Sequence, residues 1–220
     1  MSKLIYYVAA TMDGYIATKN HELGWLEAFT LSDDATPYDI FYQGIGSAII
    51  GAGTYEWIME NTAGHWPYQN IPCFILSSRN LSIPANINAV VVQCSVEKTA
   101  VEKTVVQQIA EDDFATKQIA TKQIATKQVA TKYIAAKQIA AKAKTAAKGK
   151  NVWVIGGGET AAFFADAGEL QQLFITTVPV FLGSGIRVLP VNHLVQAVPQ
   201  TQRFLSNGAV ETIMDIKPMT

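Results

Sequence analysis

The chain of 220 residues is poor in the residues that build disulfide frameworks and metal sites. It has two cysteines, Cys73 and Cys94, and three scattered histidines, His21, His65 and His193. Both cysteines lie within or next to predicted strands, which favours reduced, buried thiols over a disulfide framework. The histidines have no metal-ligand spacing, so we expect no metal site.

Long hydrophobic runs and targeting segments are also missing from the sequence. No apolar run approaches the ~20 residues that a membrane-spanning helix needs. The apolar run over residues 3–10 is too short for the hydrophobic region of a signal peptide, and it soon meets Asp13 and Gly14. We therefore expect a cytoplasmic protein that has no membrane partner.

Charge is scarce, because only 16% of the residues are charged whereas 49% are hydrophobic. This composition allows a large buried core and argues against a disordered chain. The formal net charge of −1 conceals an uneven distribution. Residues 114–150 hold nine lysines and no acid, which leaves eight basic and 18 acidic residues in the rest of the chain.

Residues 114–150 are a low-complexity segment whose clearest five-residue unit is Ala-Thr-Lys-Gln-Ile. Alanine, lysine and glutamine favour a helix. A period of five places successive Ile or Val side chains about 140° apart around a helix, so they form no amphipathic stripe. We therefore expect an extended, exposed helix outside the core, most simply a solvated repeat without chemistry. Its lysines are not accompanied by arginine, by a pattern of interleaved aromatic residues or by a recognition motif, so we do not expect nucleic acid as a partner, and an acidic partner is the alternative.

The rest of the chain alternates short apolar runs with segments that favour helices. Strands are predicted over residues 3–10, 47–50, 72–76, 88–93, 152–155 and 170–179, and helices over 33–43, 55–60, 96–110 and after Gly158. Three further short strands, over 194–198, 202–205 and 210–216, end the chain, with a hairpin turn at Ser206-Asn207-Gly208. This order predicts an α/β fold with a mostly parallel sheet, helices on both faces and an antiparallel C-terminal edge.

One stretch, Val152–Phe164, combines a predicted buried strand, the glycines Gly156, Gly157 and Gly158, and the start of a helix. This order lets backbone N–H groups at a helix N-terminus face an anion, and glycine allows a phosphate to approach closely. The spacing differs from the Gly-x-Gly-x-x-Gly of Rossmann folds, so a tight turn without a ligand is the alternative. Gly51–Thr54 forms a second strand–glycine–helix unit upstream.

Four polar or glycine-rich loops follow the ends of predicted strands, at Asp13, Gly51–Thr54, Ser77–Arg79 and Gly156–Glu159. In parallel sheets, ligands bind beyond the carboxyl ends of the strands. The hydroxyls and the arginine of Ser77–Arg79 suit a phosphate, although an ordinary polar turn would need the same residues. Together the four loops predict a binding site along one edge of the sheet.

These segments resemble the dihydrofolate-reductase-like superfamily, and most closely its branch related to the C-terminal reductase domain of bacterial riboflavin biosynthesis. The resemblance begins in Ile5–Ala17, continues in order through Ile50–Glu56, Ile75–Arg79 and Val154–Glu159, and includes Thr176–Gly183. It covers about residues 3–113 and 151–216. Residues 1–220 would therefore form a single reductase-like domain that is interrupted by the repeat.

The resemblance implies that NADPH binds across the strand ends and that the protein is a homodimer. The cofactor-binding residues that it implies are Ala10, Gly51, Gly53, Thr54, Ser77, Ser78, Arg79, Gly156, Gly157, Gly158 and Thr160. Dihydrofolate reductases usually have a basic residue just after the glycine that Gly51 matches, whereas this chain has Ala52. Recognition of the 2′-phosphate of NADPH would therefore depend on Arg79.

The implied activity is hydride transfer to a carbonyl or imine carbon of a heterocyclic substrate that is pyrimidine-ribityl-like or pterin-like. Folate itself is not expected, because Glu27, Asp33 and Asp34 do not match the register of the pterin-binding carboxylate. Asp13 and Glu159 are the candidate catalytic groups, since each lies at a strand end beside glycine. The simpler interpretations are an Asp-Gly turn and a first-turn acid that the helix dipole favours. Two alternatives stay open, namely a non-catalytic nucleotide-binding protein and a scaffold whose lysine-rich arm binds an acidic partner.

Overall fold

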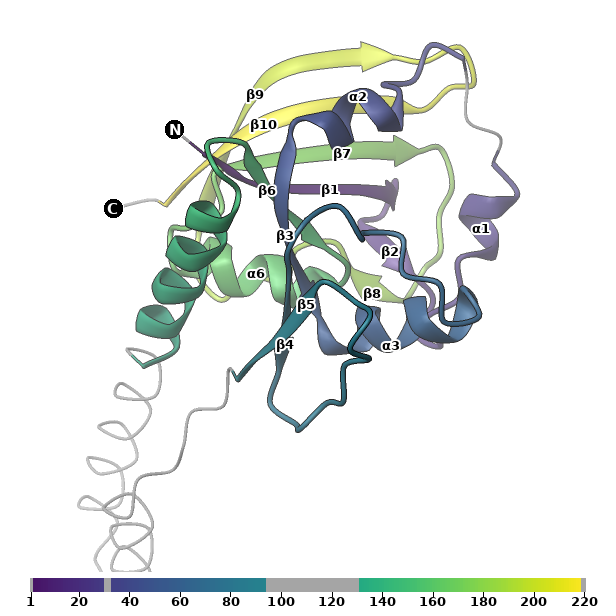
Figure 1. The fold of residues 1–220 in the computed structure, drawn as a ribbon. Helices are drawn as coiled ribbons and strands as arrows, with labels where there is room; N and C mark the ends of the chain where they lie inside the picture. Colours follow the sequence, from purple (N-terminus) through teal and green to yellow (C-terminus); the bar gives the residue numbers. More distant parts are fainter. Residues whose placement is uncertain (1, 30–32, 94–130, 219–220) are drawn as a thin grey trace, which may run out of the picture.

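The computed structural model describes residues 2–29, 33–93 and 131–218 and centres on an eight-stranded sheet (Figure 1). The strand order is β5-β4-β3-β6-β1-β7-β10-β9. The strands are β1 (Leu4–Thr11), β3 (Ile45–Gly51), β4 (Cys73–Ser77), β5 (Ala89–Gln93), β6 (Asn151–Ile155), β7 (Gln172–Val178), β9 (Val195–Phe204) and β10 (Val210–Pro218). Pairing is parallel from β5 across to β7 and antiparallel on to β10 and β9, which confirms the predicted fold class.

Helices cover both faces of this sheet, as the sequence predicts. They are α1 (Gly24–Glu27), α2 (Tyr38–Gln43), α3 (Ala52–Asn61), α6 (Gly158–Asp166) and a helix over residues 131–146. α2 starts at Tyr38 rather than at residue 33, because the residue before Pro37 is disfavoured in helical conformation. None of the described helices has the length and apolar character needed to cross a membrane.

Two hydrophobic clusters fill the space between the sheet and its helices. Alternation along β6 sends Val152 and Val154 to the face covered by α6 and the 131–146 helix. Trp153 and Ile155 point to the opposite face, where α3 and α2 pack. Strands buried on both faces require nearly continuous apolar runs, and this requirement explains the strand signal in the sequence.

The C-terminal edge is one long hairpin. β9 is a single strand, where the sequence predicts two shorter ones, and its pairing with β10 shifts register beside Pro199. Proline is tolerated there because β9 is the last strand of the sheet. The predicted turn at Ser206-Asn207-Gly208 joins the two strands, with Gly208 at a positive φ of 87°. A two-stranded sheet of β2 (Tyr15–Ala17) and β8 (Ile186–Arg187) lies outside this arrangement, and β8 was not predicted.

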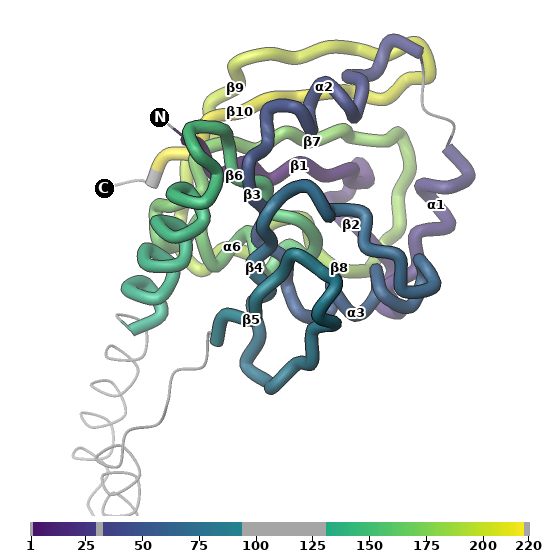
Figure 2. Tube along the Cα trace, in the orientation of Figure 1, coloured from purple at the N-terminus to yellow at the C-terminus, as the bar shows by residue number. Residues whose placement is uncertain are grey.

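The C-terminal part of the low-complexity segment belongs to the core, so the expectation of an exposed helix over all of residues 114–150 is wrong. Figure 2 shows the 131–146 helix beside the sheet. Its buried residues recur at helical spacing and are Ala136, Ile139, Ala140 and Ala143, followed after the helix by Ala147. The period-of-five argument considered Ile and Val alone, whereas the alanines supply the apolar stripe. Ile134 is indeed exposed.

Small residues on both sides bring this helix close to β3. The Ser47 hydroxyl donates a hydrogen bond to the Ala143 carbonyl oxygen at 2.8 Å. Gly46 is so close that an added Cβ would overlap the carbonyl group of Ala147. Residues 114–130, the predicted helix over 96–110 and Cys94 lie outside the described residues.

Gly46→Ala should destabilise the protein by about 1–3 kcal/mol, because β3 or the segment after the helix must move to accept the methyl group. Urea denaturation would measure the change. Gly24→Ala is the matched control, since no atom lies within 4 Å of its added Cβ, and we expect a change below about 0.5 kcal/mol. Equal stability of Gly46→Ala and the wild type would contradict this docking of residues 131–147.

Candidate functional site

The carboxyl ends of the parallel strands lie along one edge of the sheet. β3 pairs in parallel with β4 and β6, and β1 pairs in parallel with β6 and β7. The loops that follow Thr11, Gly51, Ser77 and Ile155 therefore emerge at the same edge. The sequence predicted a site at these four loops, and the sheet topology brings them to one side of the molecule.

The two glycine loops contact each other directly. The backbone N–H of Gly157 donates to the Thr54 hydroxyl at 3.3 Å, which joins the N-terminus of α6 to that of α3. A Cβ at Gly156 would overlap the Thr54 side chain, and Gly156 has a positive φ of 102°. A Cβ at Gly51 would lie 2.5 Å from the Thr160 hydroxyl oxygen. Packing between the loops therefore explains two of the glycines without a ligand.

Two further glycines have no such explanation in the described structure. A Cβ at Gly53 or Gly157 would meet no atom within 4 Å, and neither residue has a positive φ. Gly157 is the N-cap of α6, and Gly53 is the second residue of α3. Open space beside the N-terminal amides of two adjoining helices suits a phosphate, because helix N-termini favour negative charge. The site therefore fits the phosphorylated group that the sequence predicts.

Gly158, Thr160 and Ala10 are placed in different surroundings. A Cβ at Gly158 would overlap the carbonyl oxygen of Arg187, so this glycine allows β8 to pack against α6. Thr160 is half-buried and faces Gly51. Ala10 is buried in β1 beside Thr177 of β7. These three residues shape the edge, and their roles toward a cofactor remain predictions.

The loop after β4 is tied to α3. The buried Ser77 hydroxyl accepts from the Arg79 backbone N–H at 2.9 Å and donates to the Arg79 carbonyl oxygen at 2.7 Å. These bonds form the polar turn that was the alternative to a ligand site. Ser78 is exposed. The Arg79 guanidinium donates through Nη2 to both carboxylate oxygens of Glu56, at 2.8 and 2.9 Å.

The Asp13 carboxylate anchors the loop after β7. It accepts from the Thr11 hydroxyl at 2.6 Å, from the Gly183 N–H at 2.7 Å and from the Leu182 N–H at 3.2 Å. The Thr11 hydroxyl contributes most to lowering the pKa of Asp13, and the two backbone amides lower it further. Asp13 is therefore held ionised as an acceptor at neutral pH.

The second candidate catalytic group, Glu159, is exposed in the first turn of α6. Its position fits the favourable interaction of an acid with the helix dipole. Glu159 has no hydrogen bond or ion pair to another described residue. Its catalytic role, like that of Asp13, remains a prediction.

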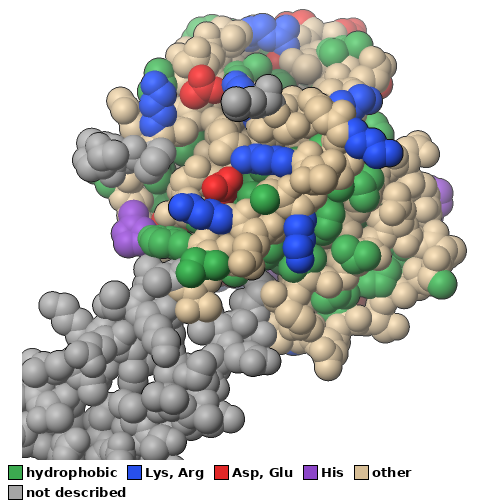
Figure 3. Space-filling model, turned by 60° about the vertical axis from the view of Figure 1, so that its left-hand side comes forward, with side chains coloured by type: hydrophobic (Ala, Val, Ile, Leu, Met, Phe, Trp, Pro, Cys, Tyr) green, Lys and Arg blue, Asp and Glu red, His purple; other side chains and the backbone are tan. Residues whose placement is uncertain are grey.

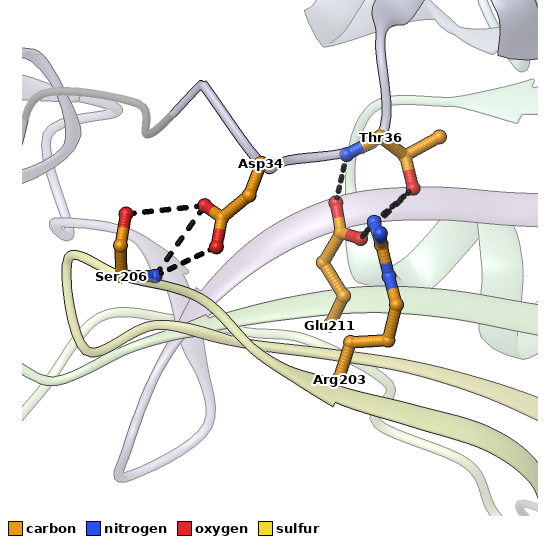
Figure 4. A network of polar contacts seen from close by, with 5 residues as sticks. All are labelled: Asp34, Thr36, Arg203, Ser206 and Glu211. Atoms are coloured by element: carbon orange, nitrogen blue, oxygen red, sulfur yellow. Dashed lines mark hydrogen bonds and ion pairs between the residues drawn. The ribbon is translucent and has the colours of Figure 1, made fainter.

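A second polar cluster fixes the loop before α2 to the C-terminal hairpin (Figure 4). Glu211 is only 4% exposed, accepts from the backbone N–H and the hydroxyl of Thr36 at 2.8 Å each, and pairs with Arg203. Asp34 accepts from the backbone N–H of Ser206 at 3.0 Å. Sequence reasoning missed this cluster, because its members are far apart in the chain and show no motif.

Comparison with known proteins identifies the family. The family model for the RibD C-terminal domain matches residues 2–206. The chain belongs to the RibD C-terminal domain family. This membership confirms the family resemblance on which the sequence analysis relied.

One sequence relative and two solved structures illustrate what the chain is similar to. The uncharacterized protein YwjB of Bacillus subtilis (strain 168) is 25% identical over 84% of this chain and 80% of its own. A putative riboflavin biosynthesis protein from Shewanella sp. PV-4 has a TM-score of 0.66 at 17% identity, with 98% and 99% of the two chains covered. A dihydrofolate reductase from Enterococcus faecalis, complexed with NADP(H), has a TM-score of 0.50 at 11% identity, and the match covers 99% of this chain and 97% of the reductase chain. These two structures show the fold that the chain shares with them.

Asp13→Asn should lower the melting temperature most at neutral pH. At that pH the wild-type Asp13 is a charged carboxylate that accepts three hydrogen bonds, and the variant loses this charge. A carboxyl whose folded pKa is lowered stabilises the fold above its unfolded pKa of about 3.9, and this contribution is lost as the pH falls through the folded value. The difference in Tm between wild type and variant should therefore shrink below about pH 4.

Asp39→Asn, on the exposed side of α2, is the control for that measurement, and we expect no comparable pH dependence. A Tm difference for Asp13→Asn that stays constant between acidic and neutral pH would refute the anchoring role of this carboxylate.

Proposed function

We propose that this member of the RibD C-terminal domain family is a reductase that binds NADPH across the carboxyl ends of its parallel strands. The observation that carries the proposal is the pair of glycines, Gly53 and Gly157, that the protein's own packing does not require. They lie at adjoining helix N-termini, where a phosphate would find backbone amides and no side chain in its way. Family membership supports the same assignment.

The groups at this edge divide the binding of such a cofactor between them. The N-termini of α3 and α6 would hold the phosphates, and Ser78 with Arg79 would contact the adenosine end. The bound nicotinamide supplies a hydride for a carbonyl or imine carbon of a heterocyclic substrate. Asp13 would position the loop after β7, whose exposed Phe181 would help to exclude water. The substrate we propose is of the pyrimidine-ribityl type, as the family and its riboflavin-biosynthesis neighbour suggest.

A non-catalytic nucleotide-binding protein is the second candidate function. It is favoured by the state of the two carboxylates, because Asp13 is engaged as an acceptor and Glu159 is exposed. A scaffold that binds an acidic partner has less support. On the face shown in Figure 3, Lys and Arg side chains are dispersed among hydrophobic and polar ones, with acidic side chains between some of them.

A homodimer is part of the same proposal. β9 lies at the end of the strand order and carries the exposed Phe204, so one of its edges can pair with a second copy. Sedimentation of the protein at micromolar concentration would show a dimer, and a monomer at all concentrations would refute this part.

Gly157→Ala tests the cofactor site with little risk to the fold. Its φ of −59° suits alanine and the added methyl group meets no protein atom, so stability should change by less than about 0.5 kcal/mol. NADPH, followed by its fluorescence, should bind about tenfold or more weakly, because the methyl group occupies the space of a phosphate.

Gly156→Ala, in contrast to Gly157→Ala, should destabilise the fold by about 1–3 kcal/mol, because alanine is strained at the positive φ of residue 156 and its methyl group would overlap Thr54. Full NADPH affinity in Gly157→Ala, or no binding by the wild type, would exclude the proposed site. Oxidation of bound NADPH by pyrimidine substrates would then separate a reductase from a binding protein.

A further inference from the structure

The Arg79–Glu56 ion pair joins two elements that meet at the proposed adenosine end of the site. Arg79 follows β4, and Glu56 lies on α3, just beyond Gly53 and Thr54. Both side chains are on the surface, with exposed fractions of 62% and 38%. A single guanidinium nitrogen contacts both carboxylate oxygens, and the other two donate to no described residue.

Arg79 is the only basic residue in the two loops concerned. Residues 51–56 contain no basic residue, and the position just after Gly51 is occupied by Ala52. In residues 77–80, Arg79 is the only cation. The Ser77 hydroxyl is occupied by the backbone of Arg79. Among the described residues of these two loops, the only cation that a phosphate would meet is therefore the Arg79 guanidinium, which is already paired with the Glu56 carboxylate.

We infer that Glu56 sets the preference between NADPH and NADH by competing with the 2′-phosphate for Arg79. This inference rests on the proposed function, because it assumes that a nicotinamide dinucleotide binds at this edge. NADH carries a 2′-hydroxyl, which can donate a hydrogen bond to a carboxylate such as Glu56. NADPH carries a phosphate on the 2′-oxygen, and the Glu56 carboxylate repels this phosphate. The wild type should therefore bind the two cofactors with similar affinity.

Glu56→Gln removes the competing charge and keeps the shape of the side chain. We expect the dissociation constant for NADPH, measured by nicotinamide fluorescence, to fall about three- to tenfold, as for a charge pair near the surface. The constant for NADH should stay the same or rise. The gain for NADPH should also shrink at high salt, because both charges are exposed.

Glu60→Gln is the matched control, since it removes the same charge one helical turn further along α3, where Glu60 is exposed. An equal gain in Glu60→Gln would show a general charge effect and overturn the inference. Arg79→Gln should lower NADPH affinity and spare NADH. In the Arg79→Gln background, the gain of Glu56→Gln for NADPH should shrink to the part that direct repulsion contributes, and a fully additive gain would overturn the inference as well.

The two proposals fail in different ways. If the wild type binds neither NADPH nor NADH, the proposed function is wrong and the inference falls with it. If both cofactors bind and Gly157→Ala weakens both, but Glu56→Gln leaves their ratio unchanged, the inference alone is wrong.

Discussion

The contact between the two glycine loops is the constraint on which the arrangement of this edge depends. β3 pairs in parallel with β6, so α3 and α6 begin at neighbouring strand ends, although they cover opposite faces of the sheet. The Thr54 hydroxyl accepts a hydrogen bond from the N–H of Gly157 between the two helix starts. Thr54 leaves no room for a side chain at Gly156. Two helix N-termini are thereby fixed next to each other, and their dipoles add at the same place. Neither loop alone would make a distinctive anion site.

Most polar side chains at this edge are already engaged in holding the structure. Asp13 binds the loop after β7, and Ser77 closes the turn that ends in Arg79. Glu211 connects the loop before α2 to the hairpin of β9 and β10. The groups left for a ligand are mainly backbone amides at glycines and the Arg79–Glu56 pair. If a cofactor binds at this edge as we propose, the protein would hold it through fixed dipoles, and the cofactor would supply the reactive group.

The helix over residues 131–146 shows how a repetitive segment can still form part of a core. Ala143 of the helix lies against Ser47 of β3, and Ala147, just after the helix, lies against Gly46, so small residues on both surfaces let helix and strand approach closely. Lys144 remains at the rim, where it pairs with Glu169. Dispersion contacts of these small residues, together with the buried Ile139, hold the helix in place.

The sequence by itself determined the fold class and the four loops of the edge, since buried parallel strands need continuous apolar runs and tight strand–helix turns need glycine. The order of motifs also indicated the family. Only the tertiary structure decided which glycines serve packing and which leave open space, because Gly156 meets Thr54 and Gly158 meets Arg187, residues that lie far from them in the sequence. It likewise placed Glu56 against Arg79 and the repeat's alanines against β3. Such pairings join residues that are far apart in the sequence. They come into contact only in the folded protein, where the strand order of the sheet places them next to each other.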